Sequence, residues 1–263
     1  MSLNPLTRCI VVLAACTLPM NAQAAQCGAK SPPQTAALVE LYTSEGCSSC
    51  PPADKWLSTL GQPADAPGLI VPIALHVDYW DYIGWKDPYA KREFSTRQRK
   101  LADLRRATFV YTPQVLLQGR DFRGWGSKAF DDAVASINAR RATAGISLTI
   151  GSPRNDALPV DARAELFDPG QEGGAALYLA AYENKLVAAV KAGENEGRTL
   201  VHDFVVLEWV GPIEFGPDGR IHEARSLALL PKAVPANSGV VAFVQNRRSA
   251  EVLQAIMLPA CPG

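Results

Sequence analysis

The sequence predicts an α/β domain, with a mixed sheet flanked by helices, followed by an all-β, sandwich-like domain. Strand-like and helix-like stretches alternate up to about residue 142, which is typical of a sheet with mainly parallel strands. From Gly145 onward, short apolar runs follow one another between Gly, Pro and Asp turns, with almost no helical pattern. An apolar content of 48 % and a charged content of 20 % in 263 residues are those of a globular, core-forming protein.

The first half is expected to hold strands and helices in the order β-α-β-α-β-β-α. Pro51 and Pro52 fit the start of the first helix, because the first N–H groups of a helix have no partner within it. A nearly continuous apolar run at 69–77 indicates a buried central strand. The expected strands cover residues 36–42, 69–77, 112–120 and 122–125, and the expected helices cover residues 50–60, 89–106 and 127–141.

The second half is expected to form about seven strands. Their spacing and their turn residues are those of an antiparallel sandwich or barrel. We place the two domains at residues 26–143 and 144–263. The expected strands cover residues 146–150, 160–166, 175–182, 186–192, 200–209, 221–229 and 239–245.

Residues 1–25 have the pattern of a signal peptide. Arg8 precedes a short apolar run, and Ala22-Gln23-Ala24 is a small-x-small cleavage site. We therefore expect a periplasmic or secreted protein. Residues 13–16 also resemble a lipobox, which would place a lipid anchor on Cys16 instead. No other apolar run is long enough to cross a bilayer.

The charge balance excludes some partners. Lys and Arg together number 26, and so do Asp and Glu. This balance argues against nucleic acid or an anionic membrane as the main partner. The oligomeric state is left open.

Four cysteines remain after the signal segment. Cys27 and Cys261 lie far apart in the chain, and in an oxidising compartment such a pair predicts a structural disulfide. Closing so long a loop is worth at most roughly 5 kcal/mol in the chain-entropy model. The alternative is that both remain free thiols.

Cys47 and Cys50 form a Cys-x-x-Cys pair between a short apolar strand and a helix. Free N–H groups and partial positive charge at a helix N-terminus stabilise a thiolate over a thiol. We therefore expect Cys47 to be the nucleophile and Cys50 to resolve the mixed disulfide that Cys47 forms.

Two blocks of sequence together resemble the thioredoxin superfamily, and glutaredoxins in particular. Residues 39–43 before the Cys-x-x-Cys pair form the first block, and Thr112-Pro113-Gln114-Val115 followed by two glycines forms the second. The resemblance covers about residues 36–142 and implies a thioredoxin-like fold with a cis peptide before Pro113, facing the cysteines. It also implies that Glu40 moves the proton of Cys50, although an outward-facing strand residue is an equal alternative.

Nearly the whole chain after residue 25 is also similar to a family of bacterial exported proteins described only as a domain of unknown function. The shared motifs are residues 46–54, 76–81 and 193–197. Two features differ from the redox families: the stretch between Cys50 and Pro113 is longer, and Ser48-Ser49 is not their usual dipeptide. Whether the protein oxidises, reduces or isomerises disulfides is left open.

Further candidates for a substrate groove are His76, Asp78, Trp80 and Thr112. His76 and Asp78 follow the central strand, where open α/β sheets place their sites, but a histidine at a strand end is more often structural. Trp80 belongs to an aromatic segment that suits either a substrate platform or core packing. His202 and residues 194–197 carry no chemistry that the sequence can assign.

The sequence therefore predicts thiol–disulfide exchange on a protein or a glutathione-like thiol, with a separate redox partner. No cofactor is expected besides the redox-active Cys47–Cys50 disulfide. One alternative is a copper-binding or metallochaperone protein, in which the two cysteines and His76 hold a soft ion. Another is a non-catalytic interaction module with an inert disulfide.

Overall fold

The computed structural model describes residues 26–60, 69–168, 170 and 173–261. The signal segment and Cys16 therefore lie outside the described residues. The α-helices are α1 (Pro51–Ser58), α2 (Arg92–Leu104) and α3 (Lys128–Asn138), with short 3₁₀ turns at η1 (Asp78–Ile83) and η2 (Pro235–Asn237). The strands are β1 (Gln26–Lys30), β2 (Ala37–Thr43), β3 (Ile70–His76), β4 (Gln114–Leu117), β5 (Arg120–Asp121), β6 (Ala144–Gly151), β7 (Ala157–Leu166), β8 (Ala175–Glu183), β9 (Leu186–Ala189), β10 (Thr199–His202), β11 (Val205–Glu214), β12 (Arg220–Ala228), β13 (Ser238–Asn246) and β14 (Val252–Pro259).

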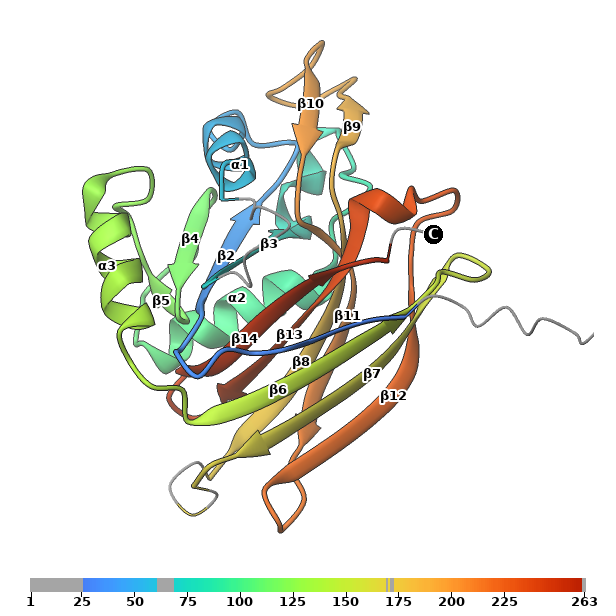
Figure 1. The fold of residues 1–263 in the computed structure, drawn as a ribbon. Helices are drawn as coiled ribbons and strands as arrows, with labels where there is room; N and C mark the ends of the chain where they lie inside the picture. The colour runs from blue at the N-terminus through green and yellow to red at the C-terminus, as the bar shows by residue number, and fades with distance from the viewer. Residues whose placement is uncertain (1–25, 61–68, 169, 171–172, 262–263) are drawn as a thin grey trace, which may run out of the picture.

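Most of the described strands belong to two sheets (Figure 1). An eight-stranded sheet has the order β14-β13-β8-β11-β3-β2-β4-β5, and a four-stranded sheet has the order β1-β6-β7-β12. The four-stranded sheet covers the β14-β13-β8 part of the larger one. The remaining two strands, β9 and β10, form a hairpin that projects beside α1.

The predicted fold class is wrong. β11 pairs in parallel with β3 (Val205 opposite Ala74) and antiparallel with β8, so strands from both halves of the chain form one continuous sheet. The described chain is mainly β, with 44 % strand and 18 % helix, and has a sandwich-like architecture instead of a separate α/β domain. A buried central strand needs a neighbour on each edge, and the second neighbour of β3 comes from beyond residue 200. The sheet thus runs across the expected boundary near residue 143.

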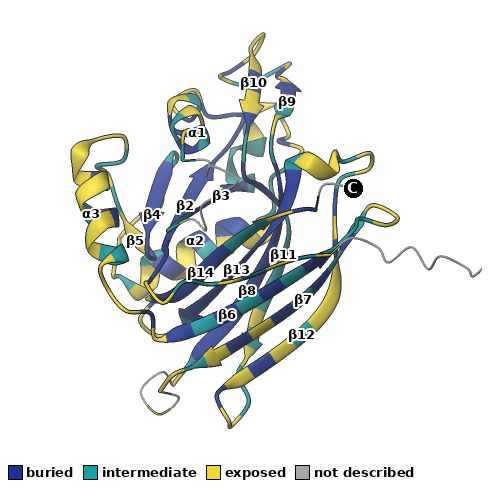
Figure 2. Ribbon diagram, in the orientation of Figure 1, coloured by how far each residue is buried: buried dark blue, intermediate teal, exposed yellow. Residues whose placement is uncertain are grey.

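The strands are buried in two different ways (Figure 2). β8 is buried along its whole length, since Leu177 and Leu179 face the four-stranded sheet while Tyr178 and Tyr182 face the core on the opposite side. β6 alternates between buried and half-buried residues, because only one face of it is covered. Continuous apolar runs therefore form the shared layer of the sandwich, and alternating runs form its outer layer.

The helices cover both faces of the sheet around β2. Trp56 of α1 packs edge-on against Phe130 of α3 at 5.0 Å, so these two helices lie together. Arg97 of α2 instead reaches Glu40 of β2 on the other face. Successive residues of a strand point to opposite faces, so β2 presents two separate surfaces.

A disulfide joins Cys27 to Cys261, the pair expected from the sequence. The S–S distance is 2.04 Å and the Cα atoms are 5.6 Å apart. Cys27 lies in β1, at the edge of the four-stranded sheet, and Cys261 follows β14, at the edge of the eight-stranded sheet. The bridge therefore ties the two layers of the sandwich together.

Within the described part of the chain, no helix is both long and apolar enough to span a bilayer.

Candidate functional site

Cys47 and Cys50 lie in the loop between β2 and α1. Both are free thiols and both are buried, with Cys47 only 1 % exposed. The backbone N–H of Cys50 donates to the carbonyl oxygen of Cys47, which closes the loop as α1 begins. Pro51 and Pro52 occupy the first turn of the helix, where their missing N–H groups cost nothing.

The surroundings of Cys47 favour its thiolate. The hydrogen bond from the Cys50 thiol is the main cause that lowers its pKa to about 6, and hydrogen bonds with the side chains of Ser49 and Thr112 lower it further against the effect of burial. The Ser49 hydroxyl lies 3.2 Å from Cys47 Sγ, and the protonated thiol would donate to the Thr112 carbonyl oxygen at 3.8 Å. A pKa near 6 makes Cys47 a nucleophile at neutral pH.

Cys50 behaves in the opposite way. Burial raises its pKa well above the usual value, and its hydrogen bond to Cys47 and the negative charges of Cys47 and Asp54 raise it further. One sulfur of the pair is thus held as a thiolate and the other as a thiol. Groups with pKa values driven apart are suited to separate chemical roles.

Asp54 lies one helical turn after Cys50, on the same face of α1. The residue is 8 % exposed, and burial raises the pKa of its carboxyl group. The Thr43 hydroxyl is close enough to both residues to lower the pKa of each. Asp54 is thus close enough to Cys50 for its negative charge to raise the pKa of that thiol.

A buried group of histidines and carboxylates adjoins Asp54, which we call the His–carboxylate cluster (Glu45, Asp54, His76, Asp87 and His202). His76 Nδ1 lies 2.7 Å from Asp87 Oδ2, and His202 Nε2 lies 3.3 Å from Glu45 Oε1 and its Nδ1 3.9 Å from Asp54 Oδ2. The two imidazole rings meet edge-to-face at 5.0 Å. The cluster connects α1, the end of β3 and β10.

His76 and Asp87 form an ion pair in this cluster, but other polar atoms of the cluster lack well-aligned hydrogen bonds among the described residues. Burial opposes a charge on His76 and on Asp87, but their pairing outweighs it, so the pKa of His76 is raised and that of Asp87 is lowered. Glu45 Oε1, His76 Nε2 and both ring nitrogens of His202 lack a well-aligned hydrogen bond within the described structure. Even so, no group of three His, Cys, Asp or Glu residues there has the geometry to hold a metal ion.

The segment from β9 to β10 (residues 186–202), which we call the β9–β10 arm, holds the cysteine loop. The side-chain amide of Asn195 donates to the carbonyl oxygens of Glu45 (2.9 Å) and Cys47 (2.8 Å). Glu194 Oε2 accepts from the backbone N–H (2.9 Å) and the hydroxyl (2.8 Å) of Ser48. The loop is therefore fixed by residues about 150 positions later in the chain.

The Thr112–Pro113 peptide is cis, as the resemblance implied. The Trp80 indole N–H donates to Thr112 Oγ1 at 2.7 Å, which joins η1 to the proline loop. Two of the expected groove residues, Trp80 and Thr112, thus lie together with Pro113, and the Thr112 carbonyl oxygen is 3.8 Å from Cys47 Sγ.

Other expected site residues lie elsewhere. Glu40 accepts two hydrogen bonds from Arg97 (2.8 and 2.9 Å) and one from Tyr42, on the face of β2 that α2 covers. Because Thr43 points to the opposite face, towards Cys50, the predicted proton transfer by Glu40 is wrong in this geometry. Asp78 accepts from Ser95 at the start of η1.

His76 is fully buried inside the His–carboxylate cluster, beside Asp87 and His202, and is not exposed to a substrate. Sequence reasoning missed Asp54, Glu194, Asn195 and His202. Asp54 could have been found from its four-residue spacing to Cys50, which brings two helix residues together. The other three lie in the β9–β10 arm, and nothing local in their sequence connects them to the cysteines.

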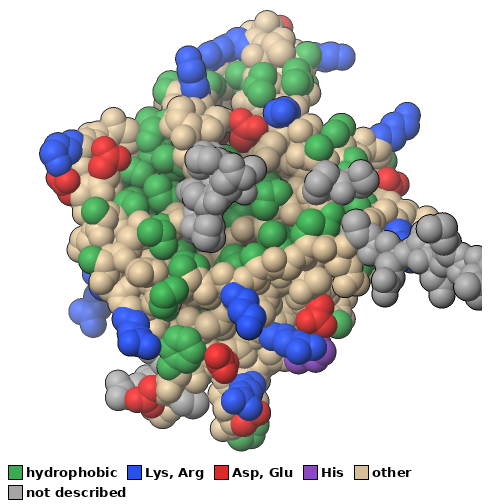
Figure 3. All heavy atoms as spheres, viewed as in Figure 1, with side chains coloured by type: hydrophobic (Ala, Val, Ile, Leu, Met, Phe, Trp, Pro, Cys, Tyr) green, Lys and Arg blue, Asp and Glu red, His purple; other side chains and the backbone are tan. Residues whose placement is uncertain are grey.

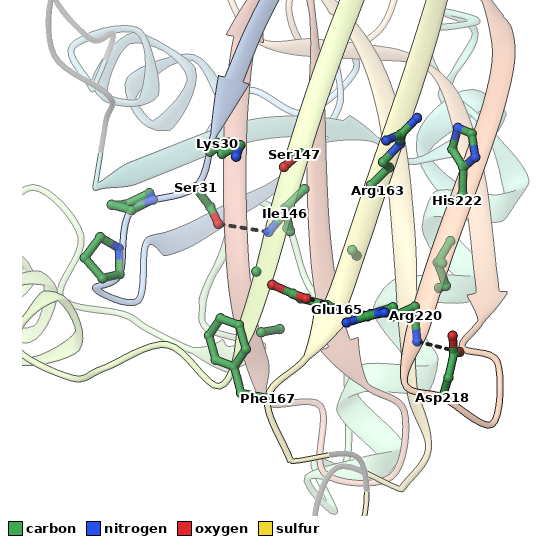
Figure 4. Close-up of a pocket in the computed structure, with 16 residues that line it drawn as sticks. Lys30, Ser31, Ile146, Ser147, Arg163, Glu165, Phe167, Asp218, Arg220 and His222 are labelled. Atoms are coloured by element: carbon green, nitrogen blue, oxygen red, sulfur yellow. Dashed lines mark hydrogen bonds and ion pairs between the residues drawn. The ribbon is translucent and has the colours of Figure 1, made fainter.

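A hollow of about 890 Å³ lies on the four-stranded sheet, and neither Cys47 nor Cys50 lines it (Figure 4). Arg163, Arg220 and His222 line it beside Glu165 and Asp218. Figure 3 shows basic and acidic side chains interspersed over this face. The mixture of charges favours no particular ligand.

Comparison with known families gives one match, to the family described as "Protein of unknown function (DUF1223)", over residues 38–245. The chain belongs to the DUF1223 family. The match extends from β2 almost to the end of β13, so it includes the cysteine loop, the His–carboxylate cluster and the β9–β10 arm. No curated protein matches this DUF1223 chain.

Two solved structures share the fold. One is protein AGR_C_4864 from Agrobacterium tumefaciens, with 24 % identity and a TM-score of 0.58, covering 88 % of this chain and 96 % of that one. The other is HBP35 of Porphyromonas gingivalis, with 14 % identity and a TM-score of 0.65, covering 88 % of this chain and 76 % of that one. These similarities establish the fold of this DUF1223 chain and no activity.

Proposed function

We propose that this protein is a thiol–disulfide oxidoreductase that acts through Cys47 and Cys50. The observation that carries the proposal is the contrast between the two sulfurs: the pKa of Cys47 is lowered to about 6, while burial raises that of Cys50. An inert structural disulfide has no need of a stabilised thiolate beside a suppressed one.

In the reductive direction, the Cys47 thiolate attacks one sulfur of a substrate disulfide. The substrate S–S bond breaks, the first substrate thiolate leaves and takes a proton from water, and a mixed disulfide remains on Cys47. Asp54 then accepts the proton of the Cys50 thiol. Cys50 attacks Cys47 Sγ and expels the second substrate thiolate, so that two electrons pass to the substrate and a Cys47–Cys50 disulfide forms.

The Thr112–Pro113 loop is where the substrate would bind, because it adjoins Cys47. The Thr112 carbonyl oxygen lies 3.8 Å from Cys47 Sγ, and the Thr112–Pro113 peptide is cis. A protein disulfide and a glutathione-like disulfide both remain candidate substrates. A separate thiol partner would return the Cys47–Cys50 pair to its starting state.

We also propose that the protein works outside the cytoplasm, in the periplasm or as a secreted protein. The Cys27–Cys261 disulfide supports this location, because such bridges persist in oxidising compartments. The expected signal segment at residues 1–25 agrees with it.

Trapping experiments test the activity. With Cys50→Ser, a substrate disulfide should remain bound to Cys47 as a stable mixed disulfide, whereas Cys47→Ser should trap nothing. A Cys27→Ser/Cys261→Ser double variant is the control that leaves the proposed active cysteines unchanged. The proposal fails if Cys47 in the fully reduced protein reacts with iodoacetamide at pH 7 no faster than free cysteine does.

A further inference from the structure

Glu194 is the charged group that the structure attaches most directly to the dipeptide between the two cysteines. Its carboxylate oxygen Oε2 accepts both polar hydrogens of Ser48, at 2.9 and 2.8 Å. These contacts hold the pKa of Glu194 below its usual value, so the carboxylate is ionised at neutral pH. A full negative charge therefore lies against the residue that follows Cys47.

This charge faces solvent and is not neutralised. Glu194 is exposed, and none of the ion pairs found within the described structure includes it. Arg198, the nearest arginine along the arm, donates to Asn195 Oδ1 at 2.7 Å instead. Because Ser48 adjoins Cys47 in the chain, a disulfide that reacts at Cys47 comes close to this charge.

Holding the loop does not by itself require an acid. Asn195 already fastens the same loop through two backbone carbonyl oxygens. A neutral glutamine at position 194 could accept the same two hydrogens from Ser48 through its amide oxygen. The negative charge is thus a separate property of the site, beyond its hydrogen bonds.

We propose that Glu194 is a specificity-determining residue, which disfavours anionic disulfides and favours cationic disulfides as reaction partners of Cys47. The inference rests on the proposed function, since it assumes that Cys47 attacks disulfides. Like charges a few ångströms apart at a solvent-exposed site repel one another, and opposite charges attract, by an amount that salt reduces. Oxidised glutathione is an anionic disulfide of biological type, so Glu194 selects against it and in favour of basic polypeptide segments.

The test compares two small disulfides of opposite charge, cystamine (cationic) and oxidised glutathione (anionic). Their second-order rate constants with the reduced full chain are measured at pH 7.5 and low salt, in the wild type and in Glu194→Gln. We expect the cystamine-to-glutathione rate ratio to fall about fivefold in Glu194→Gln. High salt should reduce this ratio in the wild type and change it little in the variant.

Glu196→Gln is the matched control, because Glu196 is an exposed acid in the same turn and makes none of the contacts with Ser48. In Glu196→Gln, the cystamine-to-glutathione rate ratio should differ from that of the wild type by less than half the change seen in Glu194→Gln. Both variants must show the thermal unfolding curve of the wild type, because an unfolded fraction would expose thiols that react with both disulfides.

The possible results separate the two proposals. If Glu194→Gln changes both rate constants by the same factor, Glu194 only holds the loop and this inference is overturned, while the exchange activity stands. If the reduced wild type reacts with neither disulfide faster than free cysteine does, the proposed function itself is overturned.

Discussion

The two faces of β2 carry two buried charged groups that differ in how completely they are paired. On one face, Glu40 receives two hydrogen bonds from Arg97 and one from Tyr42. Arg97 also donates to Gln245 and lies over three aromatic rings, 4.8 Å from the nearest centroid. On the other face, the His–carboxylate cluster keeps several polar atoms without a well-aligned partner.

The difference in pairing indicates that the two buried groups have different roles. A fully paired buried ion pair holds its protons and its geometry, so it suits packing between α2 and the sheet. An incompletely paired cluster can take up or release a proton without breaking a network. The cluster beside Cys50 therefore suits proton transfer, and the acid that the sequence suggested, Glu40, belongs to the structural face.

The largest expected effect is on stability, from Arg97→Met. This change leaves Glu40 buried without its partner, which typically costs about 3–5 kcal/mol, or a fall in Tm of roughly 10 °C. Thermal unfolding measures it. The double variant Glu40→Leu/Arg97→Met should recover most of the loss, and equal instability of the two variants would refute the pairing argument.

The next effect is on rate, from Asp54→Asn. Loss of the proton acceptor should slow release of the second substrate thiol on the order of 10²-fold, with little change in the first. Stopped-flow detection of the two thiols separates these steps. Because burial raises the pKa of Asp54, the neutral variant should be at least as stable as the wild type. Glu40→Gln is the control. A similar slowing of the second step in that variant would contradict the assignment of proton transfer to Asp54 and not to Glu40.

The pH dependence of stability gives a third test. The Cys47 pKa falls from its usual value of 9.0 in the unfolded chain to about 6 in the folded chain. Between these values the unfolded state binds more protons, so the contribution of Cys47 to stability is full above pH 9 and is lost as the pH falls to 6. The free energies of unfolding of the reduced wild type and of Cys47→Ser are measured in urea at the same reductant concentration. The difference between them should shrink as the pH falls from 9 to 6. A constant difference would mean that the folded site does not favour the thiolate.

The smallest effect is expected from Trp80→Phe. The change removes the hydrogen bond from the indole to Thr112, which is worth about 1 kcal/mol. Since Cys47 is almost fully covered, a looser contact here should speed its reaction with a bulky aromatic disulfide by roughly fivefold and change its reaction with iodoacetamide less. Unchanged rates with both reagents would show that Trp80 does not control access.

Local sequence patterns predicted the elements near the cysteines, because those elements depend on neighbouring residues. The apolar run at 69–77 and the prolines after Cys50 each carry a local signal, and β3 and α1 occupy those positions. The cis peptide before Pro113 was instead implied by the thioredoxin resemblance. The same reasoning failed for the architecture. The pairing of Val205 with Ala74 depends on which strand finds the open edge of β3, and no pattern within β11 identifies that partner.

The site was predicted unevenly for the same reason. Cys47, Cys50 and Pro113 lie in short recognisable motifs. The contacts of Glu194, Asn195 and His202 with the cysteine loop join residues that are far apart in the chain, and a single sequence contains no measure of such proximity. Glu40 was misjudged because an acid within an apolar strand shows that it is buried and not which face it occupies.

The bridge between Cys27 and Cys261 imposes an order on biosynthesis. The true partner of Cys27 is 234 residues away, whereas Cys47 follows it after only about twenty. Until the later strands assemble, the entropy cost of closing a loop between Cys27 and Cys47 is about 2 kcal/mol smaller than that of closing the native loop between Cys27 and Cys261. The incorrect pair is therefore favoured early in folding. A newly made chain thus forms the native bridge only if Cys27 stays apart from Cys47 until β14 has assembled, or if an isomerase corrects the wrong pairing.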